Sequence, residues 1–175
     1  MSFSIDGKTV IVTGAANGIG AALARHFAEN DANVMCADID EKALKKDLGE
    51  SADDSNVRYF AGDLREKLTL ANLLSATVDA FDRVDVLVNA SRQIAPTNPL
   101  DMDDDTVEKL LQQNLMTSLR LSQLVAKRMI KQDEEQDHEF AGTIINLSSI
   151  AARLTQPELL AYSVSTAALE QMTRS

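Results

Sequence analysis

A glycine-rich turn directly follows the first apolar run of the chain, in the segment TGAANGIG that ends at Gly20. Gly14, Gly18 and Gly20 would let backbone amides approach a bound group closely at the start of the following helix. Unpaired amides and the dipole of a helix start form an anion site, so this turn is suited to hold phosphate groups. The spacing departs from G-x-G-x-x-G because Leu23 stands at the third small position, and a plain tight turn is the alternative interpretation.

An acidic residue, Asp38, ends the second apolar run eighteen residues after Gly20. In dinucleotide-binding folds a carboxylate at this place accepts hydrogen bonds from the adenosine ribose hydroxyls and repels a 2'-phosphate. No lysine or arginine occupies the nearby positions that could meet such a phosphate, which are Ala15, Ala16, Asn17 and Ile39. The sequence therefore predicts NAD as the cofactor in preference to NADP.

Polar residues also stand at the ends of the third and fourth apolar runs. Asp63, with Leu64 beside it, follows the third run, and Asn89, with Ala90 beside it, ends the fourth. Ligands of open parallel sheets bind at the carboxyl ends of the strands, so we expect these residues to lie beside the same cofactor. The alternative interpretation of Asp63 and Asn89 is ordinary capping of loops.

Short runs rich in valine and isoleucine alternate with longer segments of helical period, which is typical of parallel strands joined by crossover helices. The predicted strands are 9–14, 33–38, 57–63, 84–90 and 142–149, and the predicted helices are 19–29, 41–48, 65–81 and about 103–129. This order predicts an α/β fold, a Rossmann-like doubly wound parallel sheet with strand order 3-2-1-4-5. For a chain of 175 residues we expect one NAD(P)-binding domain over residues 1–175.

Two acidic segments flank the predicted fourth helix. The segment DMDDD (101–105) is predicted to cap its start, because carboxylates there accept hydrogen bonds from free amides and oppose the helix dipole. The segment KQDEEQDHEF (131–140) is predicted to be a solvated loop before the fifth strand, with docking of a partner as the alternative.

Charge and composition argue against several classes of function. The net charge of -10 and the scattered basic residues argue against binding to nucleic acid. No apolar run approaches the roughly 20 residues that span a bilayer, and the first residues lack a signal-peptide pattern, so we expect a cytoplasmic protein without a membrane partner. Cys36 is predicted to be a buried, inert thiol rather than a reactive one. His26 and His138 lie far apart without neighbouring cysteines, so no metal site is predicted.

Seven short features together resemble the short-chain dehydrogenase/reductase (SDR) family, and they cover essentially the whole chain in order. They are TGAANGIG, Asp38, GDL at 62–64, NA at 89–90, QNL around Asn114, INLSS at 145–149 and AYSVS at 161–165. The most specific feature is the position of Ser149, thirteen residues before Tyr162 and after the fifth predicted strand.

The resemblance implies roles for individual residues. Tyr162 would be the general acid/base, Ser149 would polarise the substrate oxygen, and Asn114 would hold a proton-relay water. These roles suit hydride transfer, because a phenol can take the proton of a carbinol oxygen and a neutral donor can stabilise developing alkoxide charge. Ser148 is less favoured because the family uses the second serine of such a pair, and the structural alternative for Ser149 is a bond to nearby backbone. The implied cofactor-binding set is Gly14, Asn17, Gly18, Ile19, Gly20, Asp38, Ile39, Asp63, Leu64, Asn89 and Ala90.

The most serious departure from the family is Thr166, which stands where relatives carry a lysine four residues after the tyrosine. A phenol has a pKa of about 10 in water, and the family's ammonium group lowers that pKa and binds the nicotinamide ribose. Thr166 can exchange one hydrogen bond with the ribose, so it stays in the predicted catalytic set, but it brings no charge. We expect weak turnover unless another cation substitutes, because loss of a tuned acid/base costs ~10²- to 10⁴-fold in rate.

Two further departures concern the loop after Asn89 and the end of the chain. The family usually continues N-A-G, whereas Ser91 and Arg92 stand here. Arg92 is either solvated or in contact with substrate or pyrophosphate. Family members run on well past Ser175, so we expect the last strands and the loop that covers the substrate to be missing from this sequence.

Two hypotheses of function follow. The first is an NAD-dependent oxidoreductase acting on a small secondary alcohol or ketone, and the alternative is a catalytically impaired dinucleotide-binding protein that serves as a partner subunit or redox sensor. A receiver or nucleoside-triphosphate module is excluded, since no G-K-[ST] follows the glycine turn and no acid cluster ends the first strand. In the family, the helices that correspond to 114–129 and to the one from Leu159 form dimer contacts, so a homodimer or homotetramer is expected.

Overall fold

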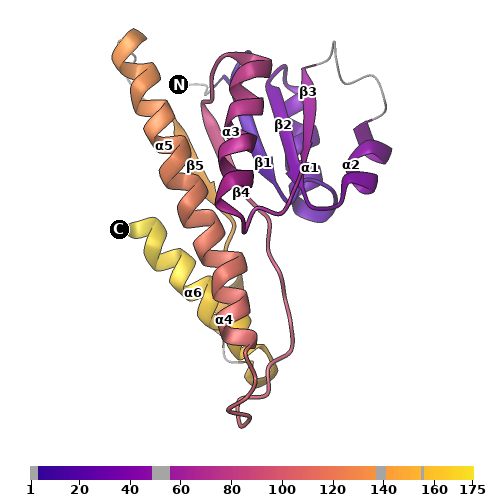
Figure 1. The fold of residues 1–175 in the computed structure, drawn as a ribbon, viewed down its shortest axis with the longest axis vertical. Coiled ribbons are helices and arrows are strands. Elements are labelled where there is room, and N and C mark those ends of the chain that lie inside the picture. Colours follow the sequence, from indigo (N-terminus) through magenta and orange to yellow (C-terminus); the bar gives the residue numbers. More distant parts are fainter. Residues whose placement is uncertain (1–3, 49–55, 137–140, 155) are drawn as a thin grey trace.

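The computed structural model describes residues 4–48, 56–136, 141–154 and 156–175. Its centre is a parallel five-stranded sheet with the order β3-β2-β1-β4-β5 (Figure 1). The strands are β1 (Thr9–Thr13), β2 (Asn33–Asp38), β3 (Val57–Ala61), β4 (Val86–Asn89) and β5 (Thr143–Asn146). The predicted Rossmann-like fold class and strand order are confirmed.

Helices cover both faces of this sheet, which is why the strands are nearly continuous in apolar residues. They include α1 (Gly18–Glu29), α2 (Glu41–Leu48), α3 (Lys67–Phe81) and α5 (Thr117–Gln136). Val10 of β1 packs in one core cluster with Phe27 of α1 and Leu44 of α2, while Ile11 packs in the other with Leu73 of α3 and Leu121 of α5. Cys36 is buried in the first cluster, as predicted.

The predictions for the start of β4 and for the segment 131–140 were wrong, and one side chain explains both. Gln132 is buried, its Oε1 accepts from the backbone N–H of Val84 (3.0 Å), and its Nε2 donates to the carbonyl oxygen of Val84 (2.9 Å). Because these bonds occupy the backbone groups of Val84, this residue does not pair with a neighbouring strand, and β4 extends from Val86 to Asn89. They also fix the helix against the sheet, so α5 continues to Gln136 instead of ending near Met129. Residues 137–140 of the predicted loop lie outside the described residues.

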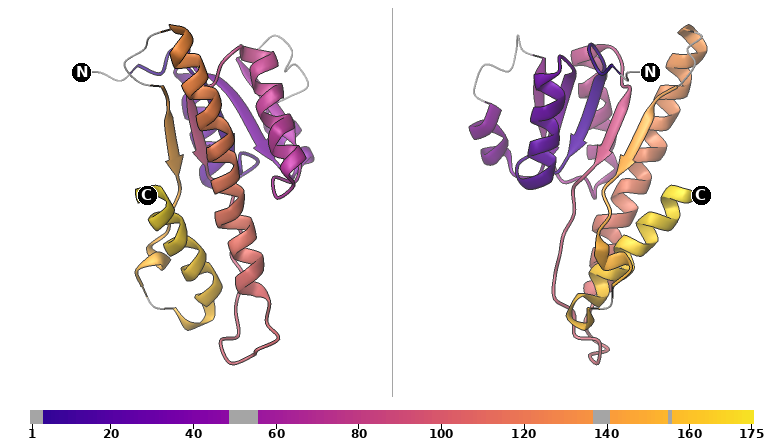
Figure 2. Two further views of the ribbon diagram at one scale, coloured as in Figure 1. Left: turned by 60° about the vertical axis from the view of Figure 1, so that its left-hand side comes forward. Right: turned by 180° about the vertical axis from the view of Figure 1, so that it is seen from behind.

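The predicted helix from about 103 to 129 divides into three parts. It begins with α4 (Thr106–Leu110), continues as a π-helical segment η1 (Leu111–Met116) and passes into α5. The N-cap residue Asp105 makes no side-chain capping bond, but the Asp104 carboxylate accepts from the first helical amide, that of Thr106 (2.9 Å), and from the backbone N–H of Asn98 (2.7 Å). The lower half of this long helix extends beyond the sheet (Figure 2).

The last part of the chain packs on that extension. Two 3-10 turns, η2 (Ile150–Ala152) and η3 (Pro157–Leu159), lead into α6 (Leu160–Arg174), which lies beside α4 and η1 (Figures 1 and 2). β5 is at the edge of the sheet, and Ile145 on it is 41% exposed.

Candidate cofactor pocket and active site

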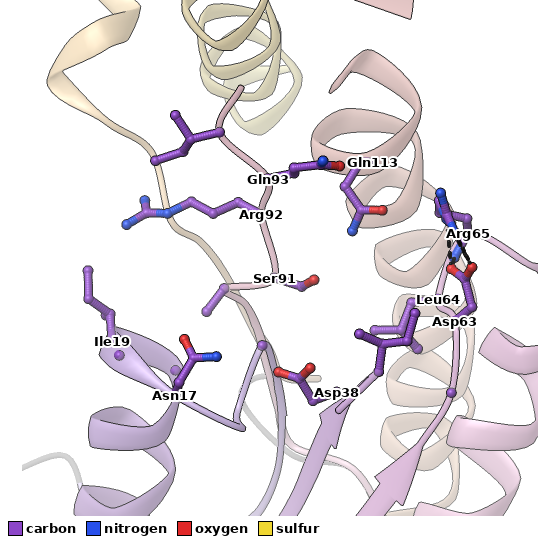
Figure 3. Close-up of a pocket in the computed structure, with 17 residues that line it drawn as sticks. Asn17, Ile19, Asp38, Asp63, Leu64, Arg65, Ser91, Arg92, Gln93 and Gln113 are labelled. Atoms are coloured by element: carbon purple, nitrogen blue, oxygen red, sulfur yellow. Dashed lines mark hydrogen bonds and ion pairs between the residues drawn. The ribbon is translucent and has the colours of Figure 1, made fainter. Parts of the chain in front are cut away.

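A cavity of about 540 Å³ lies at the carboxyl ends of the strands, where ligands of open parallel sheets bind (Figure 3). It is lined by all members of the predicted cofactor-binding set except Asn89. The other lining residues are Gly62, Arg65, Ser91, Arg92, Gln93, Ile94 and Gln113. Segments far apart in the sequence therefore meet in one place, as the strand order requires.

The glycine turn has backbone geometry that other residues could not adopt. Gly14 has a φ of +69°, and a Cβ on it would lie 2.8 Å from the Cα of Ser91. A Cβ on Gly20 would lie 2.1 Å from the carbonyl oxygen of Gly14, well inside van der Waals contact. The turn therefore places the first residues of α1 directly against the end of β1. The first turn of α1 contains no acidic residue, so nothing on the helix itself neutralises the positive end of its dipole.

Asp38 is half-buried at the end of β2, with its carboxylate in the cavity. Its Oδ2 accepts from the backbone N–H of Ala16 and its Oδ1 from that of Asp40, both at 3.1 Å. Each oxygen keeps acceptor capacity beyond this one bond. The carboxylate is thus held in a fixed orientation and can still accept from a pair of neighbouring hydroxyl groups.

Asp63 is bound to Arg65, a residue that the sequence reasoning did not single out. The Nε of Arg65 donates to both carboxylate oxygens of Asp63, at 2.9 and 3.0 Å. These hydrogen bonds lower the pKa of the Asp63 carboxyl. In the sequence, this ion pair is indicated only by the position of an acidic and a basic residue two positions apart, directly after a strand.

Thr13 fixes the loop after β4 against β1 and was also missed as a positioning residue. Its Oγ1 accepts from the backbone N–H groups of Ala90 (3.0 Å) and Ser91 (3.1 Å). In the sequence, this positioning role is indicated only by the place of Thr13 at the end of a buried strand, just before Gly14. Through these bonds the two strand ends that line the cavity are held at a defined separation.

Asn89 does not line the cavity. It is buried, and its Nδ2 donates to the Oγ of Ser122 (3.0 Å) and to the Oδ1 of Asn146 (2.8 Å). The side chain therefore joins β4 to α5 and β5 beneath the site. This arrangement is a structural role, as in the alternative interpretation of Asn89. Its contact with the cofactor stays a prediction, because the side chain does not line the cavity.

Asn114 lies in the π-helical segment and is buried. Its Oδ1 accepts from the backbone N–H of Gln93 (2.8 Å), and its Nδ2 donates to the carbonyl oxygen of Gln93 (2.9 Å) and to the Oγ of Ser165 (3.0 Å). The side chain thus joins the loop after β4 to α6. Its backbone carbonyl accepts from the Oγ of Ser118 (3.0 Å). Both N–H donors of the Asn114 amide are used by these bonds, so a relay water would have to donate to an oxygen of Asn114, either the Oδ1 or the backbone carbonyl.

Ser149 directly precedes η2, which packs against α6 where Tyr162 lies, and neither residue lines the cavity. The Oγ of Ser149 accepts from the backbone N–H of Ala151 (3.2 Å), so its own proton is available to donate. Tyr162 is 3% exposed and packs in one cluster with Ala151 and Leu110. None of the described residues exchanges a hydrogen bond with the Tyr162 hydroxyl.

Thr166 is buried one helical turn after Tyr162. Its Oγ1 donates to the carbonyl oxygens of Tyr162 (2.8 Å) and Ser163 (3.1 Å) in its own helix. A threonine hydroxyl has one proton, so this back-bonding leaves Thr166 able to accept but not to donate. The structure therefore weakens the prediction that Thr166 serves a ribose hydroxyl as the family's lysine does.

Comparison with known proteins agrees with this geometry. The family model described as short chain dehydrogenase matches residues 8–175, and the chain belongs to this family of oxidoreductases. D-threitol dehydrogenase of Mycolicibacterium smegmatis is 33% identical over 168 residues, covering 93% of this chain and 60% of that protein. The NAD-dependent glycerol dehydrogenase of Listeria innocua is 28% identical over 98% of this chain and 64% of its own length.

A solved structure gives the same result at the level of the fold. A short chain dehydrogenase/reductase from Burkholderia phymatum in complex with NAD has a TM-score of 0.87 and 26% identity, over 99% of this chain and 60% of that chain. The chain thus spans about three fifths of the length of the relatives it matches.

None of the helices within 4–48, 56–136, 141–154 and 156–175 is long and apolar enough to cross a membrane. The same residues contain no cluster of three or more histidine, cysteine or acidic side chains that could hold a metal ion.

Proposed function

We propose that this chain is an NAD-dependent oxidoreductase that moves a hydride between a small secondary alcohol or ketone and the nicotinamide ring. The observation that supports it most strongly is the cavity at the strand ends, which has the glycine turn on one wall and the Asp38 carboxylate on another. The names of the two dehydrogenase relatives, which act on glycerol and on D-threitol, are consistent with a polyol or a related alcohol as substrate.

The residues of the cavity fit a dinucleotide. The Asp38 carboxylate, held by two backbone amides, would accept from both hydroxyls of the adenosine ribose and would repel a 2'-phosphate. The start of α1 at Gly18 would bind the pyrophosphate, because its free amides and dipole favour an anion. No side chain larger than hydrogen fits at Gly20, so the backbone can approach closely there.

The bound nicotinamide supplies the acceptor or donor of the hydride. Tyr162 would take the proton of the carbinol hydroxyl as the carbon loses its hydride, and would return it in the reverse direction. Ser149 would donate its free proton to the same oxygen and stabilise the charge that develops on it. The burial of Tyr162 among apolar groups would keep bulk water away from this proton transfer.

The test is a steady-state assay of the chain with NAD and a panel of secondary alcohols. Tyr162→Phe removes the transferable proton and should abolish the measured turnover, while Tyr59→Phe, on β3, should leave it unchanged. Unchanged rates in Tyr162→Phe would remove this residue from the mechanism. Binding of NAD without turnover of any alcohol would contradict the proposed catalysis but not the proposed cofactor site.

A second candidate is a dinucleotide-binding subunit with impaired catalysis, and the observation that favours it is Thr166. Its hydroxyl proton is committed to its own helix, and it supplies no positive charge beside Tyr162. This candidate predicts tight NAD binding without turnover, together with recovered turnover in Thr166→Lys.

We also propose that the chain forms a homodimer or homotetramer through α5 and α6. Ile130 on α5 is 54% exposed, and Leu160 and Val164 on α6 are 39% and 38% exposed. Burial of such side chains between copies would remove apolar surface from water. Sedimentation at micromolar concentration tests this, and a strictly monomeric species would contradict it.

A further inference from the structure

The charged residues that line the cavity lie on different sides of it. Asp63 and Arg65 lie at one side of the cavity and Arg92 at the opposite side, with Asp38 between them in this view (Figure 3). Arg65 is neutralised by its ion pair with Asp63. Arg92 is exposed, and no described carboxylate forms an ion pair with it. The part of the cavity around Arg92 therefore has a positive charge that no described carboxylate compensates.

A single hydrogen bond fixes where this charge lies. The Nη1 of Arg92 donates to the carbonyl oxygen of Ser148 at 3.2 Å. Ser148 directly precedes Ser149, so the guanidinium group is bound next to the serine proposed to contact the substrate oxygen. The bond uses one of the five N–H donors of the group and leaves the others for a ligand.

Glu170, the acidic side chain bound to Ser148, is already paired with other arginines. Glu170 accepts from the Oγ of Ser148 (2.9 Å) and pairs with Arg153 (3.3 Å) and Arg174 (2.9 Å). These partners lower the pKa of the Glu170 carboxyl, the hydrogen bond from Ser148 most of all. The remaining cavity residues around Arg92, including Ser91, Gln93 and Gln113, are uncharged. Among the residues that the structure describes, none thus provides a counter-ion for Arg92.

We propose that Arg92 binds a carboxylate of the substrate, which makes the preferred substrates hydroxy acids and the corresponding oxo acids. This inference rests on the proposed function. A guanidinium group matches a carboxylate in shape and charge, and charge-assisted bonds of this kind are stronger than neutral ones. In the proposed reaction the carbinol carbon would give up a hydride to the nicotinamide and its hydroxyl would give up a proton to Tyr162, so that the C–OH group would become a carbonyl. The carboxylate itself is unchanged.

The competing ligand for Arg92 is the cofactor's own pyrophosphate, since Ile19 at the start of α1 lines the same cavity. We favour the substrate because the start of α1 already offers an anion site, whereas the bond to Ser148 holds Arg92 at the loop after β5, one residue before Ser149. The two ligands predict different results when Arg92 is replaced.

The experiment compares pairs of ligands that differ only in charge, namely 2- and 3-hydroxy acids and their primary amides, in the presence of NAD. KM is measured where turnover is detectable, and in every case calorimetry gives the Kd of each acid and amide for the NAD-loaded chain. The unaltered chain should prefer the acid by about tenfold or more. Arg92→Gln should remove this preference with NAD affinity unchanged, and Arg92→Lys should retain part of it. Arg65→Gln serves as the control on the other side of the cavity and should leave the preference for acids intact.

Three results would overturn the proposal. The unaltered chain could bind acid and amide equally, or Arg92→Gln could keep the preference for the acid. Weaker NAD binding in Arg92→Gln, with the same loss for acids and amides, would assign Arg92 to the pyrophosphate. Failure of the unaltered chain to bind NAD would overturn the proposed function as well, whereas NAD binding without a preference for acids overturns only the role of Arg92.

Discussion

Replacing Thr166 with lysine tests whether the missing positive charge limits turnover. Residues four apart on a helix have neighbouring side chains, with Cβ atoms ~5–6 Å apart, so a lysine at this position could bring its ammonium group near the Tyr162 hydroxyl. At a separation of about 5 Å and an effective dielectric constant of about 20, the attraction between an ammonium and a phenolate is ~3 kcal/mol. This corresponds to about a 100-fold gain in the phenolate form, since each 1.4 kcal/mol is roughly a factor of ten.

Burial reduces part of this gain. Thr166 is 2% exposed, and taking an ammonium group out of water disfavours its charged form. The long stem of lysine can carry the charge toward solvent, which limits that loss. We therefore expect turnover of alcohols to rise by ~10- to 100-fold in Thr166→Lys.

The assay is alcohol oxidation as a function of pH, with NAD saturating. A positive charge favours the deprotonated phenol, so the rise of the oxidation rate with pH should move to lower pH in Thr166→Lys. Thr166→Met is the matched control, because it has a long side chain without charge. An equal gain in Thr166→Met, or no gain in a folded Thr166→Lys variant that binds NAD, would refute the electrostatic reasoning.

Three further perturbations test the site. In Asp38→Asn, NADP affinity should rise ~100-fold, because the repulsion between a carboxylate and one phosphate charge about 5 Å away is ~3 kcal/mol at an effective dielectric constant of about 20. Calorimetry with NAD and NADP measures this change, and an unchanged ratio of the two affinities would contradict it. In Gly20→Ala, the new Cβ would lie 2.1 Å from the carbonyl oxygen of Gly14, so NAD binding should be lost and the free energy of unfolding should fall by ~1–3 kcal/mol. A variant that binds NAD normally would show that α1 does not need this close contact with the end of β1. In Asn114→Ala, three hydrogen bonds to Gln93 and Ser165 disappear, so the free energy of unfolding measured by urea denaturation should fall by ~2–4 kcal/mol. A decrease below about 1 kcal/mol would mean that these bonds do not stabilise the fold.

The parts of the fold that the sequence predicts well are those determined locally. The run from Thr9 to Thr13 is apolar because both faces of β1 are buried, and Gly14 has to follow because the chain turns there with positive φ. Asp38 could be placed in the cavity because it ends β2, which pairs directly with β1. These features depend on near neighbours and on the alternation of strands and helices.

The features that the sequence does not predict depend on contacts between distant residues. The length of α5 and the start of β4 follow from the bonds between Gln132 and Val84, which are 48 positions apart. The Asn114 side chain can form hydrogen bonds with Gln93 and Ser165 only when the π-helical segment and α6 have packed together. Motif spacing can identify Asn114 as important, but it cannot show that the amide is already occupied.

The central claim is that NAD lies across the carboxyl ends of the strands, with its adenosine ribose on Asp38 and its nicotinamide toward Tyr162. The most direct measurement is a crystal structure of this chain soaked with NAD. We predict density for the dinucleotide along the cavity, with both ribose hydroxyls bound to the Asp38 carboxylate. An empty cavity at saturating NAD, or a nicotinamide ring turned away from Tyr162, would contradict the account.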